Sequence, residues 1–314
     1  MKINLLITGG LGYIGSFTAK NIFNRNKKKA YVIDDLSRGN NFAKKYSNYK
    51  ILNVSERKTQ KLIQDKKINT ILHLAALTCV RESINNKKKY YKNFKFQLKF
   101  IKLLKKTNIK YFIFSSSLSV FEGNKLKKNL SPYSNYKLKL ERFLKKISSK
   151  NFKVIVLRYP NIIGSDPSGK LGEKNNFISR IVPFFYKNIL KKKKNLLFYD
   201  FRKKVYPRRS YMHVNDVSNI NIAVINNYKK FKKNFYIFNL SNKKQYSNFQ
   251  VLEELSKIMK IKPNYEIKQI NKKESITQIY KSGDDISKFI NYKPKYSNLK
   301  KILKTNLKWF KKIY

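Results

Sequence analysis

The first half of the chain alternates short apolar runs with segments in which apolar residues recur every three or four positions. The apolar runs are strand-like and cover residues 3–8, 30–34, 70–76, 111–117 and 153–159. Helix-like segments lie near residues 14–26, 56–67, 88–107 and 133–149. Strands that alternate with helices predict βαβ units and a parallel sheet. Because the runs are apolar at nearly every position, we expect helices to cover both faces of the sheet.

The pattern loosens after Tyr159. A glycine-containing loop spans 164–172, and strands are indicated at 196–199 and 234–240. Helices are predicted near 177–190, 214–227, 247–259 and 297–312. We therefore expect an α/β protein with a Rossmann-type doubly wound sheet in residues 1–160, to which later segments return. Residues 161–314 are expected to form a smaller, mixed α/β domain that binds the substrate.

The formal charge of +55 suggests a nucleic-acid-binding protein at first. Only ten of the 72 basic residues are arginines, however, and the lysines are spread along the whole chain. A surface selected for nucleic acid would be local and would also use arginine. We interpret the charge as compositional drift, and the lysine runs at 27–29, 87–89 and 191–194 as solvated faces. No specific nucleic-acid partner is expected.

Cysteine and hydropathy indicate a cytoplasmic protein. The single cysteine, Cys79, excludes an internal disulfide and fits a reducing compartment. One cysteine and two histidines at unrelated positions cannot form a metal cluster, and both histidines are interpreted as structural. The apolar run at the N-terminus is too short for a signal sequence. No segment approaches the roughly 20 apolar residues of a membrane span, so we expect a soluble protein.

The strongest local motif is ITGGLGYIGS at residues 7–16, where four of the ten glycines fall within seven positions. Gly9, Gly12 and Gly15 follow a predicted strand and open a predicted helix. Glycine permits the tight turn and lets backbone N–H groups approach a pyrophosphate at the helix N-terminus. The G-x-x-G-x-x-G spacing is the short-chain dehydrogenase variant of a dinucleotide-binding turn.

Asp34 ends the second predicted strand, nineteen residues after Gly15. A carboxylate there can accept hydrogen bonds from a ribose 2′-hydroxyl and would repel the 2′-phosphate of NADP, so NAD is the expected cofactor. Asp35 is either a further contact or a cap for the following turn. The small side chains of Ala75 and Ala76 would let the dinucleotide lie close to the carboxyl ends of the strands.

Tyr133 and Lys137 stand four residues apart on a predicted helix, which places both side chains on one face. Ser115–Ser117 end the preceding strand and bring hydroxyls to the same region. A tyrosine whose pKa is lowered by a nearby ammonium and a positive nicotinamide can take a proton from an alcohol while hydride leaves the same carbon. A serine hydroxyl would orient that alcohol. Tyr136 is interpreted as a neighbour of the base.

With these motifs in place, the sequence resembles the UDP-glucose 4-epimerases, a family of extended short-chain dehydrogenases, over almost its whole length. The matching segments follow the order of the family: TGGLGYIGS, VIDDLS, ILHLAAL, FIFSSSLSVF, SPYSNYKLKLE, LRYPNIIGSDPSGKLGE and YMHVNDV. The first five are shared by many extended short-chain dehydrogenases. The stretch at 161–173 is more particular to this family.

The resemblance implies that NAD oxidises the 4-hydroxyl of a UDP-sugar, that the 4-keto sugar rotates, and that hydride returns to its other face. UDP-glucose and UDP-galactose would thereby be interconverted. Tyr133 would be the base, Lys137 its activator and Ser117 the orienting hydroxyl. The implied NAD contacts are Gly9, Gly12, Tyr13, Ile14, Gly15, Asp34, Asp35, Ala75, Ala76, Asn93, Lys137 and Tyr159. The implied UDP-sugar contacts are Ser117, Tyr133, Asn161, Asn176 and Arg209, the last suited to bidentate phosphate binding.

The resemblance also implies a homodimer. Two subunits would pair through residues 88–107 and 133–149 as a four-helix bundle. We expect outward apolar stripes on both helices. The first stripe comprises Phe94, Leu98 and Ile101, and the second comprises Leu140, Phe143 and Leu144.

Some positions depart from the family pattern and leave affinity and substrate range open. Asn53 stands where an acidic residue is usual, and Thr78 where a lysine is frequent. Ser210 lies within an altered V-R-D-Y motif. The KKES segment at 272–275 replaces an expected R-x-G-D, with Lys272 as a substitute that offers only a point charge.

Two rival functions remain. One is another NAD-dependent nucleotide-sugar enzyme on the same scaffold, such as a UDP-N-acetylglucosamine 4-epimerase or a dehydratase. A dehydratase would need an acid pair after the Ser115–Ser117 strand, where only Glu122 occurs. The other is a non-catalytic protein that binds NAD or nucleic acid, which the complete Ser/Tyr/Lys set disfavours.

Overall fold

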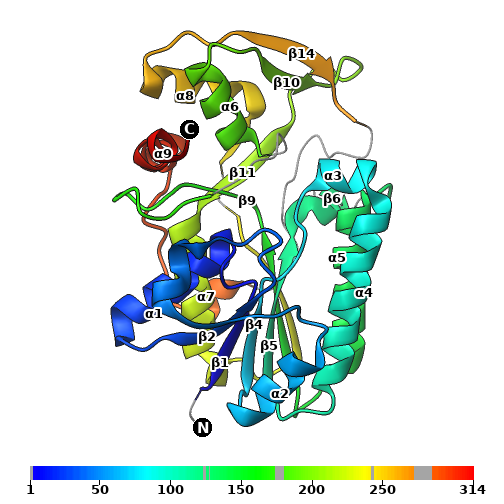
Figure 1. Ribbon diagram of the computed structural model, residues 1–314. Helices are drawn as coiled ribbons and strands as arrows, with labels where there is room; N and C mark the ends of the chain where they lie inside the picture. The colour runs from blue at the N-terminus through cyan, green and yellow to red at the C-terminus, as the bar shows by residue number, and fades with distance from the viewer. Residues whose placement is uncertain (1–2, 123–124, 127, 174–179, 242–243, 272–284) are drawn as a thin grey trace.

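A seven-stranded parallel sheet forms the centre of the molecule (Figure 1). The computed structural model describes residues 3–122, 125–126, 128–173, 180–241, 244–271 and 285–314. The strand order is β12-β8-β5-β4-β1-β2-β3. The strands are β1 Leu5–Thr8, β2 Ala30–Asp34, β3 Ser47–Ile51, β4 Thr70–His73, β5 Tyr111–Ser117, β8 Lys153–Tyr159 and β12 Phe235–Asn239. From β1 the sheet grows in both directions, through β2 and β3 on one side and through β4, β5, β8 and β12 on the other, which is the doubly wound arrangement.

Helices cover both faces of this sheet, as the continuous apolar runs predicted. On one face lie α1 (Tyr13–Asn26) and α7 (Val214–Asn226), which pack against each other and share one apolar core with the sheet. On the other lie α2 (Arg57–Asp65), α4 (Lys87–Leu104) and α5 (Pro132–Ile147), with a second core. The predicted Rossmann-type fold is confirmed.

A smaller group of elements lies beyond the carboxyl ends of the sheet strands and forms the upper part of Figure 1. Strand β9 (Asn161–Ile163) pairs with β11 (Arg208–His213), which pairs with β13 (Gln245–Ser247). Strand β10 (Asn195–Tyr199) pairs in parallel with β14 (Tyr265–Gln269). Helices α6 (Ile181–Leu190), α8 (Asn248–Met259) and α9 (Leu299–Ile313) share a third core, in which Trp309 is fully buried.

Short connecting elements complete the described part of the chain. Helix α3 (Val80–Asn85) follows β4, and the short strands β6 (Phe121–Glu122) and β7 (Lys125–Leu126) form a hairpin after β5. The 3-10 helices are η1 Asn41–Tyr46, η2 Leu118–Val120, η3 Tyr228–Lys230 and η4 Ile286–Lys288.

The expected outward stripes on α4 and α5 are wrong for half of their members. Ile101, Leu140 and Leu144 are fully buried in the core between these helices and the sheet. Phe94, Leu98 and Phe143 are only partly buried, at the edge of the same core. The apolar positions on each helix span a wide arc, so one side of the arc faces the sheet and only its flank reaches the surface.

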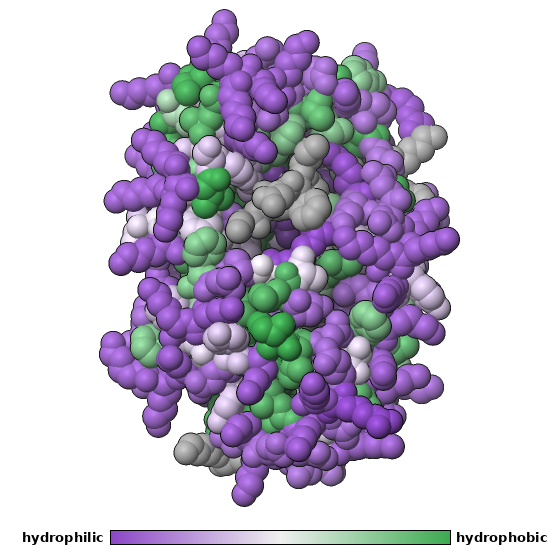
Figure 2. All heavy atoms as spheres, in the orientation of Figure 1, coloured by the Kyte–Doolittle hydropathy of each residue, from purple (hydrophilic) through white to green (hydrophobic). Residues whose placement is uncertain are grey.

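The face of the molecule shown in Figure 2 is largely hydrophilic. Figure 2 shows hydrophilic residues across the whole visible face, with the apolar residues in smaller groups between them. Among the described residues, none of the helices combines the length and apolar character needed to cross a membrane.

Candidate active site

The glycine turn between β1 and α1 has almost no room for side chains. A Cβ atom on Gly9, whose φ is +67°, would lie 2.7 Å from the backbone nitrogen of Ala75, and a Cβ on Gly15 would lie 2.4 Å from the Gly9 carbonyl oxygen. Gly12 is the N-cap of α1 and offers no side-chain cap. The turn therefore brings bare backbone and the positive end of a helix to the carboxyl edge of the sheet, which suits a pyrophosphate.

Asp34 lies buried beneath this turn at the end of β2. One of its carboxylate oxygens accepts a hydrogen bond from the Leu11 N–H at 3.0 Å, and the other accepts one from the Leu36 N–H at 2.9 Å. Burial raises the pKa of this carboxyl, and the two backbone donors oppose the shift because they stabilise the ionised form. Asp34 thus also ties the glycine turn to the loop after β2.

Seven predicted cofactor contacts line a small cavity of about 80 Å³. They are Gly9, Gly12, Asp34, Asp35, Ala75, Ala76 and Asn93. The Asn93 side-chain oxygen accepts a hydrogen bond from the Leu77 N–H at 3.3 Å. Asn53, one of the departures from the family pattern, donates its amide to Asp35 at 3.0 Å. The neutral amide of Asn53 thereby pairs with the Asp35 carboxylate, which a carboxylate at position 53 would repel.

A larger cavity of about 430 Å³, the central cleft, runs from the glycine turn past the end of β5. The predicted site residues that line it are Gly9, Gly12, Tyr13, Ile14, Gly15, Ala76, Ser117, Tyr133, Lys137, Tyr159 and Asn161. The Tyr13 hydroxyl donates to the Gly164 carbonyl, and the Tyr159 hydroxyl donates to Asn221 at 2.7 Å. The cleft therefore holds the glycine turn and the Ser/Tyr/Lys set in one continuous space.

Ser117, Tyr133 and Lys137 meet because β5 and α5 deliver them to the same place. Ser117 is the last residue of β5, and Tyr133 lies in the first turn of α5, four residues before Lys137. Ser131 caps this helix through its side chain, and Pro132 occupies the first helical position, where proline is favoured. A hydrogen bond joins the Ser117 hydroxyl to the Tyr133 phenol.

The electrostatics of Tyr133 differ from the expectation. Burial raises the pKa of this phenol, while the Ser117 hydrogen bond and the Arg180 guanidinium oppose the increase. Lys137 points elsewhere: its ammonium donates to the Ser115 carbonyl oxygen at 2.7 Å. Burial lowers the pKa of Lys137 to about 7, against the opposing charge of Glu141. Among the described residues, Arg180 is thus a cation that opposes the effect of burial on the pKa of Tyr133.

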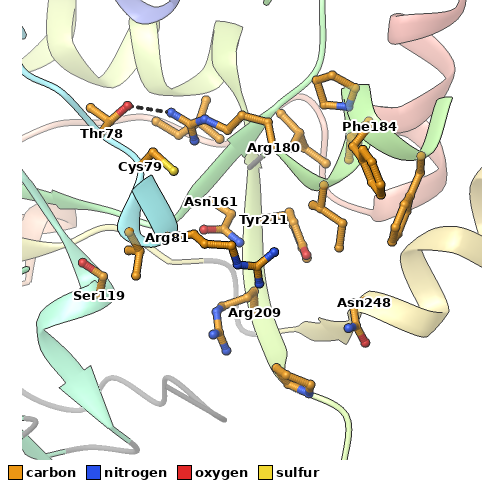
Figure 3. Close-up of a pocket in the computed structure, with 18 of the residues that line it drawn as sticks. Thr78, Cys79, Arg81, Ser119, Asn161, Arg180, Phe184, Arg209, Tyr211 and Asn248 are labelled. Carbon is orange, nitrogen blue, oxygen red and sulfur yellow. Dashed lines mark hydrogen bonds between the residues drawn. The ribbon is translucent and has the colours of Figure 1, made fainter. Parts of the chain in front are cut away.

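A third cavity of about 210 Å³, the upper cavity, lies between the sheet and the smaller group of elements (Figure 3). Two predicted substrate contacts, Asn161 on β9 and Arg209 on β11, line it. Eight residues line both this cavity and the central cleft: Thr78, Cys79, Val80, Ser119, Asn161, Ile162, Glu173 and Arg180. Because the two spaces share these walls, one ligand can extend from the upper cavity to Tyr133.

Arginines that the motif analysis did not single out line these cavities. Arg81 and Arg180 face the upper cavity together with Arg209 (Figure 3). The Arg81 guanidinium stacks 3.8 Å from the centre of the Phe198 ring. Arg38 lines the central cleft and the small cavity. Arginine is scarce in this lysine-rich chain, so the presence of an arginine was the sequence signal that could have marked these positions as part of the site.

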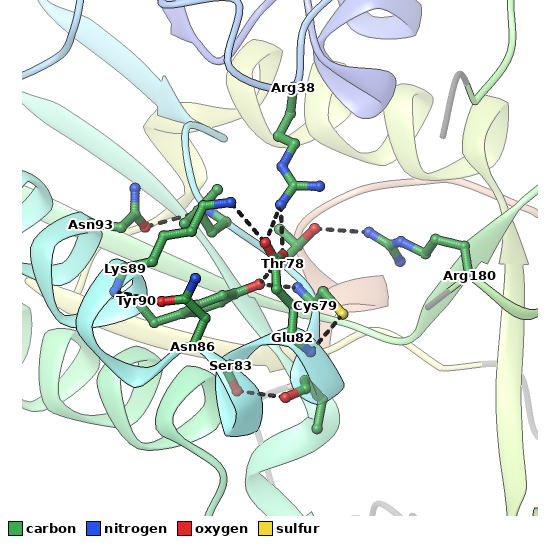
Figure 4. Close-up of polar contacts among 12 residues, drawn as sticks. Arg38, Thr78, Cys79, Glu82, Ser83, Asn86, Lys89, Tyr90, Asn93 and Arg180 are labelled. Carbon is green, nitrogen blue, oxygen red and sulfur yellow. Dashed lines mark hydrogen bonds and ion pairs between the residues drawn. The ribbon is translucent and has the colours of Figure 1, made fainter. Parts of the chain in front are cut away.

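Arg38 also joins the two walls of the central cleft (Figure 4). Its guanidinium lies 2.7 and 2.6 Å from the two carboxylate oxygens of Glu82 on α3. Glu82 further accepts hydrogen bonds from Lys89 at 2.8 Å and from the Tyr90 hydroxyl at 3.0 Å. The loop after β2, α3 and α4 are thereby held together beside the cleft.

Cys79, which the sequence indicated only as a free thiol, lies in the walls of the site. It lines both the central cleft and the upper cavity, and its sulfur caps α3 by accepting a hydrogen bond from the Glu82 N–H at 3.2 Å. Two other predictions, Asn176 and the departures at 272–275, lie outside the described residues. Ser210 is buried and accepts a hydrogen bond from the Ser241 hydroxyl at 3.1 Å.

The chain is similar in sequence and in fold to known proteins. The UDP-glucose 4-epimerase of Lactobacillus helveticus is 26% identical over 325 aligned positions, which cover 98% of this chain and 97% of that protein. The crystal structure of UDP-glucose 4-epimerase from Bifidobacterium longum in complex with NAD+ and UDP is similar with a TM-score of 0.87, at 23% identity over 98% of each chain. The UDP-Glc/GlcNAc 4-epimerase from Campylobacter jejuni gives a TM-score of 0.79, at 25% identity over 99% of this chain and 100% of that one.

A family model spans most of the part of the chain that carries the site. The model of the NAD dependent epimerase/dehydratase family matches residues 5–241, which include the glycine turn, Asp34, the Ser/Tyr/Lys set and Arg209. This range covers about three quarters of the sequence and all seven strands of the central sheet. The chain therefore belongs to the NAD dependent epimerase/dehydratase family.

Proposed function

We propose that this protein is a UDP-sugar 4-epimerase that interconverts UDP-glucose and UDP-galactose. The observation that carries the proposal is that Ser117, Tyr133 and Lys137 line the central cleft together with the glycine turn, and that this cleft shares part of its wall with the upper cavity. The curated relative from L. helveticus bears this activity in its name. The reaction would place the enzyme in galactose metabolism. The free thiol of Cys79 fits the reducing cytoplasm, which is the proposed location.

The cofactor site fits NAD. The bare turn at Gly9–Gly15 would hold the pyrophosphate, and Asp34 would hold the adenosine ribose beside Ala75, Ala76 and Asn93. Lys137 and Tyr159 would face the other end of the dinucleotide, in the central cleft. When bound, NAD supplies the reversible hydride acceptor that this family uses.

The protein's own groups would manage the proton and the orientation of the sugar. Tyr133 would take the proton of the 4-hydroxyl and, after the 4-keto sugar has rotated, return it to that oxygen, which the Ser117 hydroxyl holds in place. Lys137, buried beside the end of β5, would hold the cofactor and contribute positive charge. In the upper cavity, Asn161 and Arg209 would grip the UDP portion, since a guanidinium matches phosphate oxygens. Because the UDP portion would be held firmly, the 4-keto sugar could rotate without leaving the enzyme.

Product analysis tests the proposed reaction. The purified protein would be incubated with UDP-galactose and, separately, with UDP-N-acetylgalactosamine, and the sugar nucleotides separated by chromatography. We expect UDP-glucose from the first substrate. Conversion of the N-acetyl sugar alone would support the narrower UDP-N-acetylglucosamine 4-epimerase activity, which the relative from C. jejuni carries beside the glucose activity in its name. A dehydrated 4-keto product, or no turnover with bound NAD, would refute the proposal.

The cofactor is expected to be NAD(H). Denaturing the purified protein should release NAD(H), identified by mass spectrometry, with little NADP(H). Asp34→Asn keeps an acceptor for the ribose hydroxyl and removes one negative charge. Relief of the repulsion at a 2′-phosphate, worth about 1 kcal/mol, should raise the affinity for NADP relative to NAD by roughly fivefold to tenfold. Mainly NADP(H) in the parent protein would contradict the role of Asp34.

We further propose a homodimer formed through α4 and α5. Phe94 and Leu98 on α4 and Phe143 on α5 lie half-buried at the edge of their core, and Tyr91 is 49% exposed. Light scattering at micromolar concentration should give about twice the chain mass of 37.4 kDa. Phe143→Lys should shift the distribution toward the single-chain mass, because a lysine there would meet the partner helices. A parent protein that is monomeric throughout this range would count against the pairing.

A further inference from the structure

Arg180 occupies the junction of the two large cavities. It precedes α6 in the smaller group of elements, yet its guanidinium reaches down to the segment that follows β4 (Figures 3 and 4). It lines both the central cleft, which contains Tyr133, and the upper cavity, which contains Arg209. Among the described residues, Glu173 supplies the one carboxylate that both linings share.

Two fixed partners hold the Arg180 guanidinium in this position. One terminal nitrogen donates to the Thr78 hydroxyl at 2.8 Å. The Nε atom forms an ion pair with Glu173 at 3.2 Å. A planar guanidinium held from two sides cannot be replaced by a flexible ammonium without loss of geometry.

The segment that anchors Arg180 is also the segment that packs on Tyr133. Leu77 and Val80, on either side of Thr78 and Cys79, belong to the same apolar cluster as Tyr133. Thr78 and Cys79 therefore lie beside the ring of Tyr133. The Arg180 guanidinium, which is bound to Thr78, lies on the same side. Arg180 is accordingly the cation that opposes the effect of burial on Tyr133.

The other groups around Tyr133 include one further cation, Lys137. From its own helix come Lys137, whose ammonium is bound to the Ser115 carbonyl, and Tyr136. From β5 comes the neutral Ser117, from the start of α3 comes Cys79, and from α4 comes Tyr90. A Cys79 thiolate would disfavour a phenolate, and Glu173 is paired with Arg180.

We propose that Arg180 is a positioning residue for proton transfer: held by Thr78 and Glu173 at the junction of the cavities, its guanidinium stabilises the negative charge that forms on the Tyr133 oxygen. This inference rests on the proposed epimerase function. Lys137 and Arg180 then act from opposite sides, Lys137 from the cofactor end of the cleft and Arg180 from the substrate end. A guanidinium stays charged at every working pH.

The pH dependence of kcat/KM with UDP-galactose, measured on the NAD-loaded enzyme, tests the proposal. Arg180→Met removes the charge and keeps much of the side-chain length, and Arg180→Lys keeps the charge. Loss of a nearby cation should move the acidic limb of the profile upward by about one pH unit, which lowers kcat/KM roughly tenfold below that limb. Arg180→Lys should bring the limb only part of the way back toward that of the parent, because the charge returns without the geometry of the guanidinium. Arg202→Met, at an exposed turn in the same part of the chain, serves as the matched control and should leave the profile unchanged.

A second readout separates this inference from the proposed function. In protein labelled with ¹³Cζ-tyrosine, the Tyr133 resonance is identified by its loss in Tyr133→Phe, and its titration needs no substrate. We expect a higher midpoint in Arg180→Met than in the parent. Equal midpoints, or a kcat/KM reduced by the same factor at every pH, would overturn the role of Arg180. If the parent epimerises no UDP-sugar, the proposed function fails, and the titration alone decides the effect of Arg180 on Tyr133.

Discussion

Tyr133→Phe is expected to lower epimerase turnover by about 10²–10⁴-fold, the range for loss of a general acid–base group. The substitution removes the phenolic hydroxyl on which Ser117 acts and keeps the ring that packs with Leu77 and Tyr90. Folding and NAD content should therefore match those of the parent. Steady-state kinetics with UDP-galactose, together with quantification of the released nucleotide, would measure both effects.

Two companion variants make this test specific. Ser117→Ala should cost less than Tyr133→Phe, because it removes one hydrogen bond and leaves the proton acceptor in place. Lys137→Met should lower turnover and also weaken NAD binding, since the ammonium lies at the cofactor end of the central cleft. A Tyr133→Phe enzyme with more than about a tenth of the parent turnover would refute the assignment of the base. Tyr136 or a bound water would then be the next candidate.

The central sheet could be predicted because both of its faces are buried. Three of the five expected runs, at 30–34, 111–117 and 153–159, coincide with observed strands. The other two differ at one end: β1 begins two residues later than expected, at Leu5, and β4 ends three residues earlier, at His73. Strand β3 was missed for the opposite reason. It lies at the edge of the sheet, and four of its five residues are exposed, so no apolar run marks it.

The short strands of the smaller group could not be predicted from local pattern. Strands β9 and β13 have three residues each, and their pairing with β11 joins segments about 40 to 50 residues apart in sequence. Periodicity cannot be read in so few positions, and the partner of each strand is decided by tertiary packing. Strand β14, with four of its five residues exposed or nearly so, also lacks an apolar signature.

The candidate site was predictable where chemistry restricts residue type. Glycine at positions 9 and 15 is required because a Cβ atom would collide with backbone. The charged residues were harder to choose, because lysine is abundant throughout the chain. Among the described lysines, Lys137 alone lines any of the three cavities, whereas four arginines do: Arg38, Arg81, Arg180 and Arg209. In a lysine-rich chain, arginine is the more informative cation.

The direction in which a side chain points was beyond the reach of spacing. The four-residue interval correctly places Tyr133 and Lys137 on one face of α5. It does not reveal that the Lys137 ammonium binds the Ser115 carbonyl, or that the charge opposing the burial of Tyr133 comes from Arg180, 47 positions further along the chain. Such contacts depend on how the smaller group of elements packs over the sheet.

A buried ion pair beneath the site supports the strand that ends in Ser117. The two carboxylate oxygens of Glu141 on α5 accept hydrogen bonds from the Arg158 guanidinium on β8, at 3.0 Å to Nε and 2.6 Å to Nη2. The Ser116 hydroxyl on β5 also donates to Glu141. Glu141 is 2% exposed and Arg158 is 8% exposed, so water cannot replace a lost partner. The pair joins one helix and two strands, and the Glu141 charge helps to keep Lys137 protonated.

Glu141→Leu is therefore expected to lower the free energy of unfolding by about 3–5 kcal/mol, because it leaves the Arg158 charge buried without a counter-charge. Urea denaturation followed by circular dichroism would measure the loss. In the double variant Glu141→Leu/Arg158→Met both charges are gone and apolar side chains fill the space, so most of the lost stability should return. Glu141→Leu should also lower the pKa of Lys137 further, since the carboxylate that favours the ammonium is absent. If the single variant lowers the free energy of unfolding by less than about 1 kcal/mol, or if the double variant is as unstable as the single one, the Glu141–Arg158 pair does not stabilise the structure beneath the site.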